Sequence, residues 1–376
     1  MAGIYLHIPF CKQACYYCDF HFSASLKRKD EMINAIKKEL LLRKDELKSD
    51  NIKTIYFGGG TPSLLSINEI NSIFNVIYNN YKIVEKPEIT LEANPDDLTL
   101  EKIIQLSKSP INRLSIGIQS FFDDDLKFMN RAHNASEAQS CIENASKYFK
   151  NITIDLIYGV PNMSKKKWLE NLQRAFNLGV PHISSYALTV EEKTALYSFI
   201  KKGKVAPLDE NLALEHFNIL VAETKKQGFV QYEISNFGKP EYFSKHNTSY
   251  WLGEKYLGIG PSAHSFNGVE RSWNISNNPK YIKSLNAGEL PLEIEKLSLN
   301  NKFNEYIMTG LRTIWGVNLN KIKSDFGTSY SEKLLKNIKP FLQKKLLDFN
   351  IETQTLTTTK KGKFLSDGIA SDLFII

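Results

Sequence analysis

The sequence is poor in cysteine and has no long apolar run. Only four of its 376 residues are cysteines, and three of these fall within eight positions near the N-terminus. Thiols this close together cannot staple a small secreted scaffold, so a metal site in a reducing cytoplasm is favoured over a disulfide framework. No stretch approaches the roughly 20 apolar residues that a membrane span needs, and the first residues have no basic n-region or cleavage site. We therefore expect a cytoplasmic protein that is neither exported nor embedded in a membrane.

Charge of one sign is also limited. The formal net charge is +7, and the lysines lie mostly in helix-like stretches such as 27–48 and 165–167. Solvated helix faces account for most of this charge, and no clustered basic and aromatic surface of the kind that binds RNA is evident. We expect no nucleic acid partner. The composition, 42% hydrophobic and 24% charged, is ordinary for a globular chain of this length and suits two domains.

The first half of the chain alternates short β-branched segments with amphipathic ones. This rhythm predicts β/α units around a parallel sheet, and right-handed crossovers would curl the strands into an open or partial barrel. The predicted strands are Gly3–Ile8, Thr54–Gly58, Glu88–Ala93, Arg113–Ile118, Ile152–Ile157 and Ile183–Leu188. The predicted helices between them include Asp30–Leu47, Ile67–Tyr78, Ser136–Phe149 and Lys165–Leu178.

The C-terminal part follows a different pattern. After about Asn236 the chain reads as loop-rich, and near Asn301 a helical pattern begins with Phe303, Ile307, Leu311 and Ile314. A helix over 331–347 and a hairpin over 352–363 are predicted next, which together favour a small winged-helix-like domain. We divide the chain into a barrel (1–235), a connecting region (236–300) and the C-terminal domain (301–376).

Polar and glycine-rich residues follow the predicted strands. In parallel α/β structures the chemistry gathers at the carboxyl ends of strands, so one site assembled from several loops is expected there. The first strand leads to the cysteines, the second to Gly58-Gly59-Gly60-Thr61-Pro62, and the third to Glu92 and Asn94. The fourth leads to Gln119 and the fifth contains Asp155. Backbone groups of the glycine turn are expected to be free to bind an amino group and a carboxylate.

The three clustered cysteines, Cys11, Cys15 and Cys18, form a C-x₃-C-x₂-C run. Three thiolates on one loop can hold a [4Fe–4S] cube and leave its fourth iron without a protein ligand, open to a methionine-like amino acid moiety. A zinc site completed by His21 is the alternative, but zinc usually closes tetrahedrally with paired C-x₂-C knuckles. The remaining Cys141 lies in a helical pattern and is expected to be a small buried hydrophobe.

This motif, with the aromatic Tyr17 just before the last cysteine, resembles the signature of the radical SAM superfamily. The resemblance implies a [4Fe–4S] cluster that binds S-adenosylmethionine (SAM), inside an α/β fold of the partial (β/α)₆ barrel type. In that superfamily the reduced cluster cleaves SAM to methionine and a 5′-deoxyadenosyl radical.

Further motifs are similar to those of the oxygen-independent coproporphyrinogen III oxidase family and its close relatives. They are Tyr5-Leu-His7-Ile-Pro9-Phe-Cys11, the Tyr56 to Pro62 glycine turn, Asn130-Arg131-Ala-His133 and Asp155-Leu-Ile-Tyr-Gly159-Val-Pro161. The resemblance implies that Tyr5, Gly59 and Glu92 contact the cluster-bound SAM. In the oxidases, a second SAM is held by the residues that match Tyr17, Gly60, Thr61, Gln119, Arg131 and Asp155.

Two features separate this chain from the oxidases. Oxidases that resemble it usually carry a further cysteine two residues after the cluster motif, where this chain has Phe20. The segment His246-Asn-Thr-Ser-Tyr250-Trp251 resembles the H-N-x-x-Y-W motif of the HemW family of haem chaperones. An imidazole suits haem iron and nearby aromatic rings can pack a porphyrin face, so His246 is predicted to be a haem ligand. His264 and His7 are the alternatives, and a structural role for His246 is a further one.

The sequence leaves two main functions open. The first is a haem chaperone that binds haem and transfers it to acceptor proteins while carrying a SAM-coordinated cluster. The second is an oxygen-independent coproporphyrinogen III dehydrogenase, an enzyme of porphyrin biosynthesis. Radical-SAM modification of RNA is a third, weaker reading. Haem is the expected partner, respiratory haem-acceptor proteins follow from the resemblance alone, and a homodimer and a peripheral membrane contact stay open.

Overall fold

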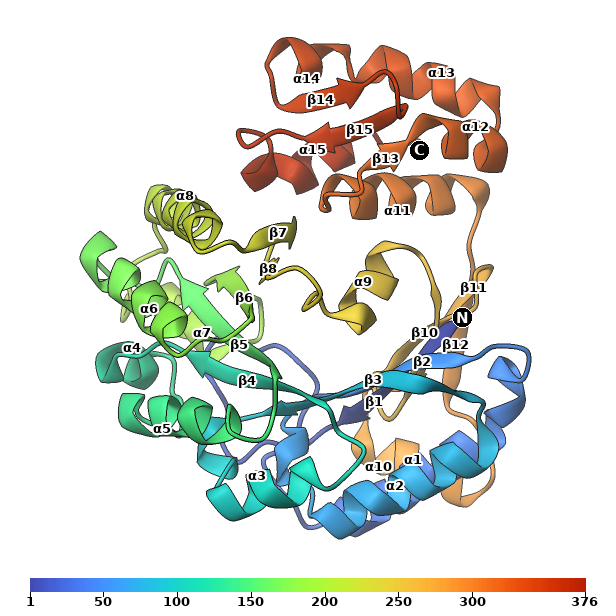
Figure 1. Ribbon diagram of the computed structural model, residues 1–376. Helices are drawn as coiled ribbons and strands as arrows, with labels where there is room; N and C mark the ends of the chain where they lie inside the picture. Colours follow the sequence, from blue (N-terminus) through green and yellow to red (C-terminus); the bar gives the residue numbers. More distant parts are fainter.

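The computed structural model describes residues 1–376, and its main feature is one curved sheet of twelve strands in the order β12-β11-β10-β9-β1-β2-β3-β4-β5-β6-β8-β7 (Figure 1). Strands β1 to β6 run parallel to one another and confirm the predicted partial barrel. Their bounds are Ala2–Ile8, Ile52–Gly59, Ile83–Ala93, Arg113–Gln119, Asn151–Tyr158 and His182–Ala187. Every end lies within two residues of its prediction except the start of β3, which begins at Ile83 because this residue already pairs with Ile52 of β2, ahead of an irregularity in the register.

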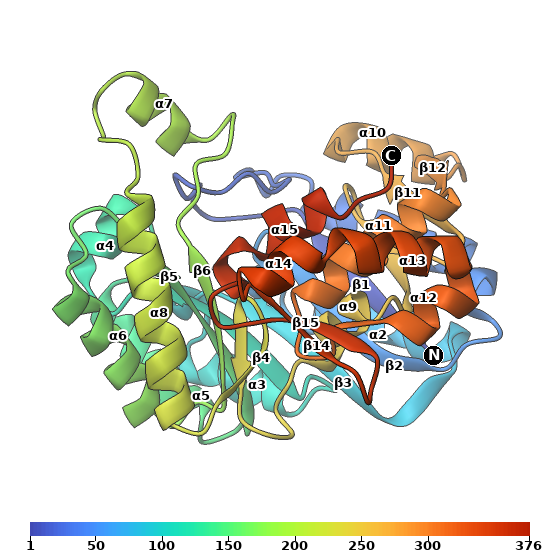
Figure 2. The ribbon, with the colours of Figure 1, turned by 90° about the horizontal axis from the view of Figure 1, so that it is seen from above.

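Helices cover the convex side of this sheet (Figure 1). They are α1 (Lys29–Leu42), α2 (Ile67–Asn80), α3 (Leu100–Ser107), α4 (Asp123–Phe128), α5 (Ala135–Ala145), α6 (Lys165–Asn177) and α8 (Glu210–Lys226). Helix α7 (Ala195–Lys201) stands apart from these and packs against Tyr16 of the cysteine loop (Figure 2). Short 3₁₀ turns lie at Lys44–Leu47, Pro62–Leu64 and Pro95–Asp97. Reciprocal caps of Ser66 with Glu69 and of Asn134 with Glu137 explain where α2 and α5 begin. No helix has the length and apolar character needed to cross a membrane.

The stretch expected to be loop-rich extends the sheet instead. After β7 (Val230–Glu233) and β8 (Asn236–Gly238), which pair at the β6 edge, the chain returns to β1. It then adds α9 (Lys245–Trp251), β9 (Lys255–Ile259), β10 (His264–Phe266), β11 (Glu270–Asn274), α10 (Asn278–Asn286) and β12 (Leu292–Lys296). Strand β9 pairs parallel with β1. These strands are short and their partner is remote in sequence, so a local pattern does not reveal them.

A buried ion pair fastens this returning segment to α1. Glu39 and Arg43 are both almost completely buried, with Arg43 Nη1 2.9 Å from Glu39 Oε1. Arg43 also donates to the carbonyl of Gly258, and the Asn274 amide donates to Glu39. Tyr281 donates to the other carboxylate oxygen of Glu39 at 2.5 Å. Residues from β9, β11 and α10 are therefore held by one buried polar network, in which only the Asn274 Oδ1 atom has no partner.

The C-terminal part has its own core and lies over the concave side of the sheet (Figures 1 and 2). It comprises α11 (Leu299–Leu311), β13 (Val317–Asn318), α12 (Leu319–Phe326), α13 (Thr328–Asn337), α14 (Lys339–Gln343), β14 (Leu347–Asn350), β15 (Thr355–Thr358), a 3₁₀ turn at Lys363–Leu365 and α15 (Ser366–Asp372). Helices with a three-stranded sheet confirm the winged-helix-like prediction. The predicted helix 331–347 is divided at Ile338, before Pro340, and the hairpin begins earlier than predicted because β14 supplies its first strand.

One edge of this C-terminal domain is tied to β7. The main chain of residues 312–314 bonds to Tyr232 and Ile234, and Arg312 reaches the buried Glu233 at 3.2 Å. Lys363, in the 3₁₀ turn before α15, donates to Gln231 at 2.8 Å. These contacts fix one side of the domain against the barrel.

Candidate functional site

The three clustered cysteines lie on the loop between β1 and α1. The loop is pinned by backbone hydrogen bonds from Cys11 to Ser23, from Tyr16 to Met129 and from Leu196 to Tyr16. All three thiols are partly exposed, whereas Cys141 is 4% exposed within α5, as its helical pattern predicted. Burial raises the pKa of Cys11 and Cys18, the latter to about 11. Both thiols are therefore protonated at neutral pH without a metal, and metal binding would release their protons.

A chain of polar side chains connects the loops that follow four neighbouring strands. Thr61 donates to the Cys11 sulfur at 3.5 Å and accepts from the Asn94 amide at 3.3 Å. Arg131 donates to the Asn94 side chain at 2.6 Å and to the Cys15 sulfur at 3.3 Å. The strand-end residues named from the sequence are thus gathered around the cysteine loop.

One hydrogen-bond donor in this arrangement is free to bind an anionic or thiolate-bound group. The Nε atom of Arg131 is buried without a hydrogen-bond partner, although it lies on the side chain that already contacts Cys15. A buried donor without a partner is costly, so a group that it could bind would stabilise the site. The residues therefore fit a cysteine-bound cluster with an amino acid ligand.

A mononuclear zinc site is a poorer fit. No three histidine, cysteine, aspartate or glutamate side chains in the structure converge closely enough to hold a single ion. The Nε2 atom of His21, the fourth ligand considered above, is instead 2.7 Å from the Asn278 side chain. Three thiols on one loop without a fourth protein ligand suit an iron–sulfur cube with one open iron better than a closed tetrahedral ion.

The glycine turn works differently from its prediction. The N–H groups of Gly60 and Thr61 already donate to the carbonyls of Ile8 and Phe10. A Cβ on Gly60 would lie 2.5 Å from the Phe10 carbonyl oxygen, so glycine is required there for close packing of the turn on the cysteine loop. Gly59 has φ +105° and its N–H faces Glu92. The turn positions the side chains of Thr61 and Glu92. The backbone N–H groups of Gly60 and Thr61 are not free for a ligand.

Two carboxylates face the interior of the barrel. Tyr56 donates to Glu92 at 2.8 Å, and burial raises the pKa of Glu92 to about 7, with further upward pressure from Asp155. Burial also raises the pKa of Asp155 to about 6, against the opposing effect of a hydrogen bond from Ser184. Arg113, which is 1% exposed, lowers both values. Tyr56 and Arg113 were not singled out from the sequence, because an aromatic and a basic residue inside strands read as structural.

The other predicted SAM-site residues lie around the same space. Gln119 ends β4 with φ +66° and is 8% exposed, close to Arg131 across Gly117. Tyr17 lies close to Cys15 and Cys18, and burial raises its pKa. The Tyr5 hydroxyl is 3.2 Å from His7 Nδ1. His133 is buried and its Nε2 faces the Ile118 carbonyl, so it braces the loop that carries Arg131.

His246 lies in the core, which does not match its predicted role. The residue is 2% exposed in the first turn of α9, where its N–H donates to Glu88. Its Nδ1 is 2.7 Å from Thr54 Oγ1 and its Nε2 is 2.8 Å from the Tyr250 hydroxyl. Its ring stacks on Tyr56 at 4.9 Å. Both nitrogens are engaged in this conformation, so iron could bind only if one of these partners moved away.

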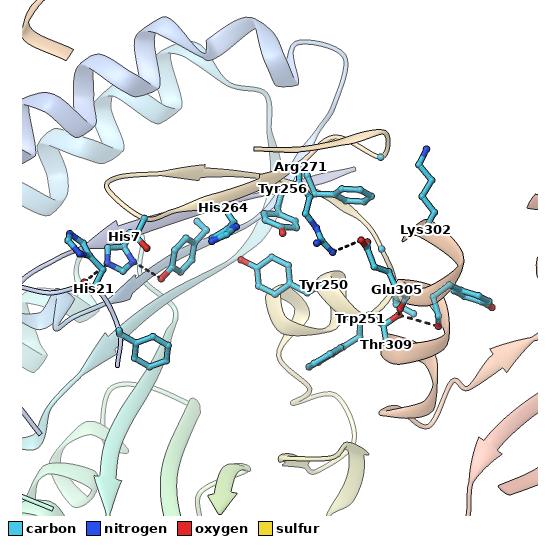
Figure 3. Close-up of a pocket in the computed structure, with 18 of the residues that line it drawn as sticks. His7, His21, Tyr250, Trp251, Tyr256, His264, Arg271, Lys302, Glu305 and Thr309 are labelled. Carbon is cyan, nitrogen blue, oxygen red and sulfur yellow. Dashed lines mark hydrogen bonds and ion pairs between the residues drawn. The ribbon is translucent and has the colours of Figure 1, made fainter. Parts of the chain in front are cut away.

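A cleft of about 700 Å³ opens between the sheet and the C-terminal domain (Figure 3). His7 and His21 lie at one side, His264 lies in the middle with two tyrosines and a tryptophan, and charged residues of β11 and α11 lie at the other side (Figure 3). The side chains that line the cleft include His7, His21, Tyr250, Trp251, Tyr256, His264, Phe266, Arg271, Lys302, Glu305 and Lys321. The sequence had suggested the aromatic motif at 246–251, but not that it faces Arg271 and Glu305.

Comparison with known proteins agrees with this architecture. The Radical SAM superfamily model matches residues 5–175, and the HemN C-terminal domain model matches residues 297–365. In fold, the chain is similar to the coproporphyrinogen III oxidase HemN of Escherichia coli, with a TM-score of 0.86 and 21% identity, covering 99% of this chain and 90% of that one. An identity this low supports a shared fold and nothing finer.

Full-length relatives are more specific. The heme chaperone HemW of Bacillus subtilis is 33% identical over 98% of both chains. The heme chaperone HemW of Lactococcus lactis is 32% identical, over 97% of this chain and 95% of the relative. With about a third of its residues shared over nearly its whole length, this chain belongs to the HemW family of the radical SAM superfamily.

Proposed function

We propose that this protein binds haem in the cleft beneath its C-terminal domain and transfers it to acceptor proteins. The observation that carries the proposal is the cleft itself, a space of about 700 Å³ that combines imidazole, aromatic and cationic side chains. Haem needs an axial ligand for iron, flat apolar walls for the porphyrin and cations for its two propionates. The relatives named heme chaperone point to the same cargo.

The same proposal assigns a [4Fe–4S] cluster to Cys11, Cys15 and Cys18 and a SAM molecule to the adjoining pocket. When bound, the pair supplies a one-electron donor next to a sulfonium. The chain's own residues hold and orient them: Arg131 neutralises thiolate or carboxylate charge, and Glu92 and Asp155 can accept hydrogen bonds from ribose hydroxyls. Membership of the radical SAM superfamily supports the cluster and SAM as cofactors. The residue assignments are part of our proposal.

The second candidate is oxidative decarboxylation of coproporphyrinogen III. It is favoured by the completeness of the Thr61–Asn94–Arg131 network around the cysteine loop. Against it, Phe20 occupies the position where the oxidases that resemble this chain usually carry a cysteine, and it is 68% exposed at the edge of the cleft. We therefore rank it second.

One experiment separates the two functions. Anaerobically reconstituted protein is offered haem or coproporphyrinogen III, each with SAM and a reductant, and both haem retention and vinyl product are measured. We expect haem to be retained through gel filtration and no vinyl product to form. Vinyl product at many turnovers per chain, without haem retention, would replace the chaperone proposal by the oxidase.

A further inference from the structure

Three histidines line the cleft, and they differ in whether their ring nitrogens are free. His7 is 5% exposed, with Nδ1 3.2 Å from the Tyr5 hydroxyl and Nε2 2.8 Å from the His21 carbonyl. His21 has one engaged ring nitrogen, Nε2, which is 2.7 Å from the Asn278 side chain, so only its Nδ1 is without a partner. His264, at the start of β10, is exposed, and neither of its ring nitrogens has a hydrogen-bond partner. An unprotonated, unpartnered imidazole nitrogen facing a cavity is what a haem iron requires.

Aromatic rings form the wall beside His264. Tyr250 and Tyr256 pack edge to face at 4.5 Å, and Phe266 follows Tyr256 at 6.3 Å. Trp273, which pairs with His264 across β10 and β11, has its ring 5.8 Å from the imidazole. In Figure 3 the imidazole and the two tyrosine rings lie in the middle of the cleft. A flat apolar ligand bound to His264 would therefore meet rings already arranged as a wall.

Charged residues lie on the opposite side of the same cleft. Arg271 on β11 pairs with Glu305 on α11 at 2.6 Å, and each side chain is about a third exposed. Lys302 and Lys321 also line this side. The pair is a bridge between the sheet and the C-terminal domain at the edge opposite to the β7 attachment. A guanidinium that binds one carboxylate through one nitrogen can accept another carboxylate in its place.

We propose that His264 is the iron ligand of the haem cargo, and that a haem propionate displaces Glu305 from Arg271 when haem enters the cleft. This inference rests on the haem-binding function proposed above. It assigns the iron ligand to β10 instead of α9, the helix that carries the H-N-x-x-Y-W motif. Exchange of the Arg271 partner loosens one edge of the C-terminal domain, while the contacts of Arg312 and Lys363 hold the other edge.

The geometry then gives His246 a positioning role. Glu88 caps α9 through the N–H groups of Lys245 and His246, and His246 Nε2 holds the Tyr250 hydroxyl. Trp251, the last residue of the helix, lies under Arg312 at 5.2 Å. The helix thereby aims two aromatic residues at the cleft, with its histidine directed into the core.

Haem titration of the full-length, cluster-reconstituted protein tests the ligand, with His264→Ala and His264→Met compared with the wild type by Soret absorption. His264 is exposed, so both variants should melt at the wild-type temperature. We expect His264→Ala to bind haem roughly tenfold more weakly, with a shifted Soret band that added imidazole restores. His264→Met should retain haem with an altered reduced spectrum. A wild type that fails to bind haem would overturn the proposed function, whereas a wild-type spectrum and affinity in His264→Ala would overturn only this ligand.

His246→Ala is the comparison variant. It should melt at a lower temperature, because it leaves Thr54 and Tyr250 without their buried partner. Its folded fraction should keep the wild-type Soret position. A changed Soret position in His246→Ala, together with an unchanged one in His264→Ala, would return the ligand to His246.

The carboxylate exchange has its own readout. Glu305→Gln should increase haem affinity severalfold, because it removes the anion that competes for Arg271, whereas Arg271→Gln should decrease it. Lys344→Gln, an exposed change on the same domain away from the cleft, is the control. Lower affinity in Glu305→Gln would contradict the exchange.

Discussion

The two sides of the concave surface are built differently. Around the cysteine loop, Thr61, Asn94 and Arg131 are hydrogen bonded to one another and to two of the thiols. Around the cleft, the hydrogen bonds of His7 and Tyr250 link them to residues of the barrel, and one partly exposed ion pair joins the sheet to the C-terminal domain. The first arrangement is preorganised to hold a small group in one position. The second can separate at a domain boundary, which suits a cargo that must leave.

The largest expected effect is on the cysteine side. Replacing Cys11, Cys15 or Cys18 by Ala should remove most of the cluster iron, because the remaining two thiolates cannot hold the cube. Iron content and visible absorption after anaerobic reconstitution measure this. Cys141→Ala, remote in α5, is the control and should keep its iron. The cysteine variants should still bind haem, and full iron retention in any one of them would refute its assignment as a ligand.

The next effect concerns the segment on which the cleft is built. Glu39→Ala should lower the free energy of unfolding by about 3–5 kcal/mol, because it leaves Arg43 buried without its main counter-charge. Glu46→Ala removes the other partner of Arg43, but Glu46 is 44% exposed, and the loss should stay below about 1 kcal/mol. Urea unfolding measures both. Equal losses in the two variants would show that burial is not what makes the first pair important.

The third prediction uses pH. Burial raises the pKa of Glu92 to about 7 from 4.5, so the folded state binds more protons than the unfolded state between these values. The free energy of unfolding therefore falls as the pH rises from 4.5 to 7, by roughly 3 kcal/mol at most, and Glu92 causes no further change above that range. Without SAM, Glu92→Gln should therefore be more stable than the wild type above pH 7 and not at pH 4. Thermal melts across this range test it, and a constant difference would contradict the raised pKa.

The smallest effect separates a core histidine from a ligand. Thr54→Val removes the partner of His246 Nδ1 and should cost about 1–3 kcal/mol, with no change in the haem spectrum. Thr248→Val is the matched control, because the buried Thr248 hydroxyl has no partner to lose. Its effect on the melting temperature should be near zero. A haem spectrum that changes in Thr54→Val would contradict the structural role of His246.

The sequence was most informative where one segment carries the whole signal. The six parallel strands show as local β-branched runs, and the cysteine spacing lies within eight residues, so both were predictable. Glu92 lies near the end of β3, and Arg131, in the loop after α4, reaches Asn94 just beyond the same strand, because parallel strands bring their carboxyl ends together. Their roles in holding SAM stay predictions.

Prediction failed where the partner is remote. Strand β9 is five residues long and its residues pair with residues of β1 that lie 253 positions earlier, so no local period marks it. The aromatic motif at His246 suggested a ligand, but only tertiary contacts with Thr54 and Glu88 direct its imidazole inward. Arg271 and Glu305 lie 34 positions apart and carry no motif, so their pairing across the cleft could not be read from the chain.

The position of β1 between β2 and β9 has a consequence for biosynthesis. Ala2 pairs on one side with Ile52 and on the other with Lys255. During translation, β1 can join β2 early, whereas its other edge stays unpaired until more than two thirds of the chain has left the ribosome. An open parallel edge of this kind is slow to close and exposed to wrong pairing. Since β10 and α9 are completed by the same late segment, the nascent chain can assemble its cysteine loop long before it has a cleft that could take up a porphyrin.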